Sequence, residues 1–163
     1  MKTLYLIRHA KSSWDSFDVA DFDRTLNERG LKDAPLMANR LKEKGIMPDL
    51  MVCSTAKRTR LTAGLFAKEL GYAEKDILYK DAIYEASENT LLKVLNEIPE
   101  QADSVFVFGH NPAITYLVNA LTGSRIDNVP TCGIACMRIE GSWAGLDEDD
   151  AELIWFDYPK NGK

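Results

Sequence analysis

Five short apolar runs recur along this chain, and stretches with the 3.6-residue period of a helix lie between several of them. The runs cover residues 4–7, 49–53, 104–108, 133–139 and 152–156. Continuous apolar runs of this length are typical of strands buried on both faces, as in a parallel sheet covered by helices. The alternation therefore predicts an α/β fold, namely a three-layer αβα sandwich with a mainly parallel central sheet.

The helical stretches have recognisable ends. Glycine, which tolerates the left-handed backbone just beyond a helix, follows three of the four. Serine and proline, which are typical of helix starts, stand at the beginning of the last two. The predicted helices run from about 28 to 44 before Gly45, from about 56 to 70 before Gly71, from Ser87 to just before Pro99, and from near Pro112 to about Gly123. No repeat, low-complexity tract or linker interrupts this pattern, so we expect a single domain over residues 1–163.

The overall charge and the cysteine count exclude some classes of partner. The formal net charge is −5, whereas a general nucleic-acid binder normally presents a basic face, so we expect no nucleic-acid partner. The first apolar run soon meets Arg8, His9 and Lys11 and is too short for a membrane span or a signal-peptide core. Three cysteines at irregular spacing fit reduced thiols better than a disulfide framework. These features predict a cytoplasmic protein with no membrane partner.

Polar residues follow three of the predicted strands directly. Arg8 and His9 come after the first strand, residues 54–58 after the second, and His110 after the strand at 104–108. Because ligands of such folds bind beyond the carboxyl ends of the strands, we expect these residues to share one site. The chain has only two histidines, and both stand at these strand ends.

Two arginines indicate what kind of ligand this site would take. Arg8 offers a planar fork of donors that suits the oxygens of a phosphate group. Arg58 stands at the start of a predicted helix, where backbone N–H groups and the helix dipole also favour an anion. Lys57 and Arg60 lie elsewhere on the helical wheel, so we expect them to face solvent. A few converging cations can bind phosphate even in an acidic protein.

Three motifs carry a resemblance to a known family. They are Leu-Ile-Arg-His-Ala-Lys-Ser-Ser-Trp at 6–14, Cys-Ser-Thr-Ala-Lys-Arg-Thr-Arg-Leu-Thr-Ala at 53–63 and Phe-Gly-His-Asn-Pro at 108–112. In order and separation they resemble the motifs of the histidine phosphatase superfamily, also called phosphoglycerate mutase-like. The segment 8–14 and Asp-Arg-Thr-Leu-Asn-Glu-Arg-Gly at 23–30 are similar to the compact phosphohistidine phosphatase branch, the SixA type. Ala10 stands where the broad superfamily motif has glycine, which suits that branch.

The resemblance implies a covalent mechanism that uses no metal or cofactor. His9 would attack phosphorus and become transiently phosphorylated, and water would then release phosphate. Arg8, Arg58 and a protonated His110 would stabilise the negative charge on the transferring oxygens. Ser12 matches a phosphate-contacting hydroxyl, although a local hydrogen bond to the backbone is an equal alternative. Arg24 would add a further cation, or else form a salt bridge with Asp21 or Asp23.

The substrate and the leaving-group acid are less constrained. Glu85 stands where relatives that act on phosphate esters carry a carboxylic acid, and an ordinary loop carboxylate is the alternative. The resemblance to the compact branch implies phosphohistidine in a protein as the substrate, such as a histidine phosphotransfer domain. The chain is short, with little room for an insertion that would enclose a small substrate. The alternative is a small phosphorylated metabolite, acted on by a phosphate-ester phosphatase or a phosphoglycerate mutase-like enzyme.

Three rival interpretations deserve comparison. A metal site formed by both histidines and a carboxylate conflicts with Arg8 and Arg58, which would repel a divalent cation. A cysteine phosphatase is suggested by the C-x5-R spacing from Cys132 to Arg138, but this segment has the pattern of a strand rather than a phosphate-wrapping loop. A non-catalytic phosphate-binding protein would have no need of both histidines. We therefore expect an enzyme.

Overall fold

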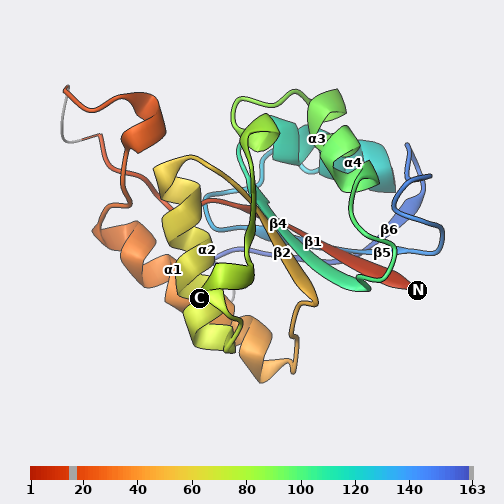
Figure 1. Ribbon diagram of the computed structural model, residues 1–163, viewed down its shortest axis with the longest axis horizontal. Helices are drawn as coiled ribbons and strands as arrows, with labels where there is room; N and C mark the ends of the chain where they lie inside the picture. Colours follow the sequence, from red (N-terminus) through yellow and green to blue (C-terminus); the bar gives the residue numbers. More distant parts are fainter. Residues whose placement is uncertain (15–17, 162–163) are drawn as a thin grey trace.

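The computed structural model describes residues 1–14 and 18–161. In this part of the chain, four α-helices lie on the two faces of one six-stranded sheet (Figure 1). The strands are β1 (Lys2–Arg8), β2 (Leu50–Ser54), β3 (Leu78–Lys80), β4 (Ser104–Gly109), β5 (Ile134–Ile139) and β6 (Ala151–Asp157). The helices are α1 (Glu28–Glu43), α2 (Lys57–Leu70), α3 (Glu88–Asn96) and α4 (Ala113–Thr122). The predicted three-layer α/β architecture is confirmed.

The residues expected at the helix ends form caps. The hydroxyl of Ser87 accepts a hydrogen bond from the backbone N–H of Thr90 at the start of α3. Gly71 and Gly123 end α2 and α4 with left-handed backbone, at φ values of 78° and 70°. A non-glycine residue adopts this conformation only at a steric cost, so these two glycines set where each helix stops.

The sheet order brings the predicted site together. Its order is β3-β2-β4-β1-β5-β6, with the first four strands parallel and the last two antiparallel to their neighbours. In the register of β1 with β4, Arg8 stands opposite Gly109. The residues that follow, His9 and His110, therefore leave adjacent strands side by side. β3 was not predicted, because it has only three residues and all are exposed.

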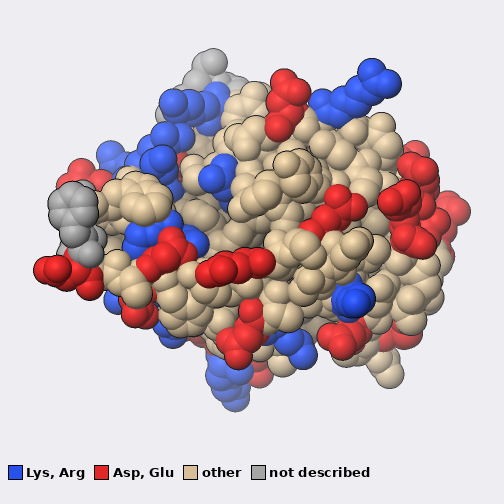
Figure 2. Space-filling view, turned by 90° about the horizontal axis from the view of Figure 1, so that it is seen from above, with Lys and Arg blue, Asp and Glu red and all other residues tan. Residues whose placement is uncertain are grey.

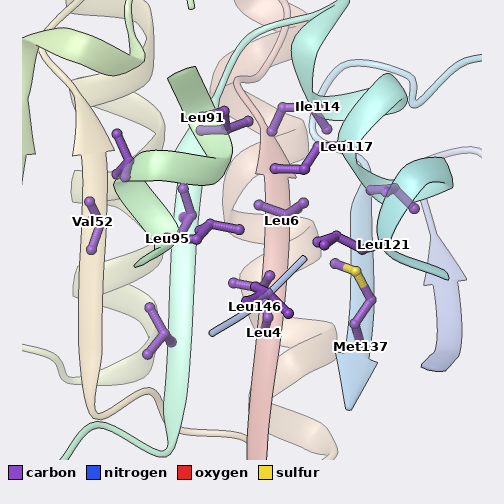
Figure 3. Packing of buried hydrophobic residues seen from close by; sticks show 14 of the residues in the cluster. Leu4, Leu6, Val52, Leu91, Leu95, Ile114, Leu117, Leu121, Met137 and Leu146 are labelled. Atoms are coloured by element: carbon purple, nitrogen blue, oxygen red, sulfur yellow. The ribbon is translucent and has the colours of Figure 1, made fainter. Parts of the chain in front are cut away.

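Side chains that alternate along each strand build two separate cores. Leu4 and Leu6 of β1 face α3 and α4, and Figure 3 shows them packed among Leu91, Leu95, Ile114 and Leu117. Tyr5 and Ile7 point to the other face, where α1 and α2 cover the sheet. Burial on both faces gives the central strands their continuous apolar pattern and holds their carboxyl ends in a rigid frame.

None of the helices in the described ranges has the length and apolar character needed to cross a membrane. The three cysteines are buried and unpaired. Trp143 is fully buried, whereas Trp14 is 71% exposed.

Candidate active site

His9 lies just beyond β1 with its ring fixed by the backbone. It is 7% exposed, and its Nδ1 lies 2.7 Å from the carbonyl oxygen of Ala10. A carbonyl can only accept, so Nδ1 carries the proton of the neutral ring and Nε2 keeps a lone pair. The Ala10 N–H donates to Thr62 Oγ1, which in turn donates to the Arg58 carbonyl. The loop that carries His9 is thus hydrogen-bonded to the first turns of α2.

His110 lies beside His9, as expected from the strand register. The two ring centroids are 5.3 Å apart. His110 Nε2 lies 2.8 Å from Ser54 Oγ and 3.3 Å from Thr59 Oγ1. These contacts come from the end of β2 and the start of α2, so the three predicted strand ends do meet at one place.

The two predicted phosphate-binding arginines both lie near enough to His9 and His110 to lower the pKa of each ring, and each is held by hydrogen bonds. Arg8 Nη1 donates to the Val129 carbonyl. Arg58 donates from Nη1 to the Asp21 carbonyl and from Nη2 to the Asp21 carboxylate, at 2.7 and 3.2 Å. Among the described residues, the Nε of each arginine and the Nδ1 of His110 are buried without a hydrogen-bond partner. Buried polar nitrogens normally have partners, and these three suit an anion with several oxygens.

Ser12 and Arg24 contact each other at the side of this group. Arg24 Nη1 donates to Ser12 Oγ at 2.7 Å, and Arg24 Nε donates to the Asp21 carboxylate at 3.1 Å. Both side chains are buried. The ion pair with Asp21 that the sequence left open is therefore present, and the Ser12 hydroxyl accepts a hydrogen bond from the Arg24 side chain. Whether either residue contacts phosphate stays a prediction.

Glu85 lies at the margin of the site, where its carboxylate helps that of Asp21 to raise the pKa of the Tyr84 hydroxyl, and its role as an acid stays a prediction. Its side chain is exposed and its backbone is left-handed, with φ 57°. Within the described residues, no ion pair or hydrogen bond joins the Glu85 carboxylate to Arg8, His9, Arg58 or His110. Its neighbour Tyr84 does reach the site, because its hydroxyl donates to Asp21 and its ring packs edge-on against His110.

Burial and positive charge set the protonation of both histidines. Burial first, and then the charges of His110, Arg58 and Arg8, lower the pKa of His9 to about 3. Burial and the nearby arginines lower the pKa of His110 to about 4. Both rings are therefore neutral at pH 7, which leaves His9 ready to attack. The expected protonated His110 differs from this free state, but a bound phosphate dianion would raise its pKa.

Charged side chains around the site are mixed in sign. Figure 2 views the molecule from the upper side of Figure 1, and lysine and arginine gather in the left half of that view with acidic side chains among them. Acidic side chains line the right-hand margin. The cations that define the pocket, Arg8, Arg24 and Arg58, are mostly buried, so they contribute little to the outer surface.

Most of the C-x5-R segment forms strand β5, which begins at Ile134, and Cys132 lies in the turn before it. Cys132 is fully buried, which raises the pKa of its thiol and keeps it protonated. Arg138 lies on β5 and pairs with Glu152 of β6. The cysteine and the arginine therefore do not enclose a common anion.

Comparison with known families agrees with the geometry. The model of the histidine phosphatase superfamily (branch 1) matches residues 4–88, just over half of the chain. The chain belongs to the histidine phosphatase superfamily. Its structural neighbours place it with the SixA-type members, and the fold, the family and these neighbours identify it as a phosphatase.

Three similar proteins match nearly the whole length of the chain. An uncharacterised protein of Mycobacterium leprae is 31% identical over 94% of this chain and all of its own length. The structure of a protein assigned as the phosphohistidine phosphatase SixA of Agrobacterium tumefaciens is 32% identical, with a TM-score of 0.82 over 97% of this chain and 98% of its own. A protein histidine phosphatase SixA complexed with tungstate shares the fold at 21% identity and a TM-score of 0.84, over 99% of each chain.

Proposed function

We propose that this phosphatase forms a phosphohistidine intermediate on His9 and acts on phosphohistidine in proteins. The observation that carries the first part is the state of the His9 ring. Its Nδ1–H is committed to the Ala10 carbonyl, so the lone pair on Nε2 is the nucleophile. The unpartnered nitrogens of Arg8, Arg58 and His110 support the assignment of the phosphate pocket.

In the first step, His9 Nε2 forms a bond to phosphorus as the bond from phosphorus to the leaving group breaks. The electron pair of the broken bond goes to the leaving group. N–H donors that are already in place stabilise the negative charge on the three equatorial oxygens. This stabilisation provides most of the catalysis of phosphoryl transfer. The buried arginines meet this need without rearrangement.

In the second step, water attacks phosphorus and the bond from Nε2 to phosphorus breaks. The electron pair returns to Nε2, and both protons of the water leave with the phosphate as dihydrogen phosphate. The Ala10 carbonyl keeps the proton on Nδ1 throughout. His9 thus returns to the tautomer in which it began.

The leaving group distinguishes the candidate substrates. An alkoxide needs a proton from an acid as it departs, and the candidate acid Glu85 is exposed, with its carboxylate beside the Tyr84 hydroxyl. An imidazole that is protonated on its second nitrogen departs as a neutral ring and needs no such acid. The 32% identity to the protein assigned as phosphohistidine phosphatase SixA points the same way.

The test is a substrate panel with wild type and His9→Ala. We expect wild type to hydrolyse a phosphohistidine-bearing protein domain at least about a hundredfold more efficiently than alkyl phosphates, since an alkoxide leaving group needs a proton and a neutral imidazole does not. Rapid quenching of wild type with ³²P-labelled substrate should trap acid-labile label on the protein, and His9→Ala should trap none.

Different failures of this experiment reject different parts of the proposal. Near-normal turnover by His9→Ala would reject His9 as nucleophile. Preference for a small phosphate ester would keep the nucleophile but reject the protein substrate. Phosphate binding with no turnover on any substrate would favour a non-catalytic binding protein.

A further inference from the structure

Asp21 joins three side chains of the site, Arg24, Arg58 and Tyr84. It belongs to the short 3-10 turn Asp21–Asp23, which lies over the start of α2. One carboxylate oxygen accepts from Arg24, and the other accepts from Arg58 at 3.2 Å and from the Tyr84 hydroxyl at 2.6 Å. Its backbone carbonyl accepts a further bond from Arg58 at 2.7 Å.

The hydrogen bonds between Arg58 and Asp21 use the two terminal nitrogens of the guanidinium group. Nη1 and Nη2 both donate to Asp21, whereas Nε is buried without a partner among the described residues. A guanidinium held at two nitrogens has a fixed plane, so the direction of its third donor is fixed as well. Asp21 therefore sets the direction in which Arg58 offers Nε.

Asp21 is itself held from two sides. Arg24 forms an ion pair with it at 3.1 Å, and Tyr84 is kept in place by ring contacts with Phe22 and His110. The hydrogen bond from Tyr84, followed by the charge of Arg58 and by hydrogen bonds from Arg24 and Arg58, lowers the pKa of Asp21 to about 2. A carboxylate that stays ionised is suited to orienting cations and unsuited to donating a proton.

We propose that Asp21, anchored by Arg24 and Tyr84, is a positioning residue that orients Arg58 toward the transferring phosphoryl group. The Asp21 side chain is 49% exposed and fills no core. Loss of the carboxylate leaves the cationic charge of Arg58 and its Nη1 bond to the Asp21 backbone carbonyl in place. It removes the Nη2 bond, so the guanidinium can turn about the one bond that remains. The loss should therefore be larger in the transition state, where geometry is strict, than in the binding of a ground-state phosphate.

The test compares Asp21→Asn with wild type in kcat, in inhibition by vanadate as a transition-state mimic, and in inhibition by inorganic phosphate. We expect kcat and vanadate affinity each to fall by about tenfold or more, and phosphate affinity to change by less than about threefold. Tyr84→Phe should show a smaller loss of the same kind, and the double variant should be no worse than Asp21→Asn alone. Asp23→Asn is the matched control, because Asp23 is exposed and forms no ion pair within the described residues; its kcat should equal that of wild type.

The proposed role of Asp21 rests on the proposed site, but failure of that role and failure of the site would give different experimental results. Equal weakening of vanadate and phosphate together with a lowered melting temperature would indicate a merely structural residue and overturn it. A loss confined to alkyl phosphates, with p-nitrophenyl phosphate turnover unchanged, would make Asp21 a proton donor and also overturn it. Retained activity in His9→Ala would instead reject the site as a whole.

Discussion

The two histidines are the residues on which the chemistry of the site depends. Burial and the neighbouring arginines lower the pKa of His9 to about 3 and that of His110 to about 4. An ordinary histidine is half protonated near pH 6.5. We predict that neither ring titrates between pH 7.5 and 5.5, so the nucleophile stays unprotonated over the whole physiological range. NMR spectra of the untagged protein can test this directly, because the chain has only two histidines.

Phosphate provides the control for that titration. A bound dianion adds negative charge next to His110, which should raise its pKa and produce a measurable midpoint in the spectrum of one ring. His110→Asn identifies which signal belongs to which ring. A midpoint near pH 6.5 for His9 in the free protein would contradict the expected environment.

At the scale of elements, α1 is packed against the loop that carries the nucleophile. Gly30, in the first turn of α1, approaches the backbone of Lys11, and a Cβ at Gly30 would lie 2.2 Å from the Lys11 carbonyl oxygen. Alanine normally stabilises a helix by up to about 1 kcal/mol relative to glycine. Here we expect Gly30→Ala to lower the free energy of unfolding by about 1–3 kcal/mol, because backbone must move. It should also lower kcat, since Lys11 is two residues from His9.

Gly64 is the matched control for this substitution. It lies within α2, and the nearest neighbour of its added Cβ is the Glu74 carboxylate oxygen at 3.2 Å, the end of a flexible side chain. We expect Gly64→Ala to leave kcat unchanged and to raise stability by up to about 1 kcal/mol. Urea unfolding and steady-state kinetics on both variants measure the difference. Equal stability changes in the two variants would show that the contact with Lys11 is unimportant.

The elements that the sequence predicted are those with a periodic pattern and clear ends. The strands before His9 and His110, and helices capped by Ser87 or Gly71, follow from local rules of burial and capping. Asp21 and Tyr84 lie in or beside three-residue 3-10 turns, which have no period to detect. Their role depends on contacts across 37 and 63 residues of sequence. The sequence did not predict the neutral state of His110 either, because that state results from burial in the folded site.

At the scale of the whole molecule, the fold places two arginines and two histidines in the interior of an acidic protein. Arg24, Arg58, His9 and His110 are all less than 10% exposed, although the formal net charge is −5. The histidines avoid the cost of burial by staying neutral. Their neutrality should link the stability of the protein to pH, because the unfolded chain binds the two protons that the folded protein excludes.

The direction in which stability changes with pH follows from the lowered pKa values of His9 and His110, about 3 and about 4 in the folded protein. Between these values and pH 6.5 the unfolded state binds more protons, so the free energy of unfolding rises with pH in that window. From pH 7.5 to pH 5 we expect a loss of about 1–2 kcal/mol for each histidine. Asp21, whose pKa is lowered to about 2, contributes only at more acidic pH. Urea unfolding should show that the free energy of unfolding of wild type rises steeply with pH, and that of the His9→Asn, His110→Asn double variant hardly changes. Parallel pH curves for the two proteins would mean that the titrating groups lie elsewhere.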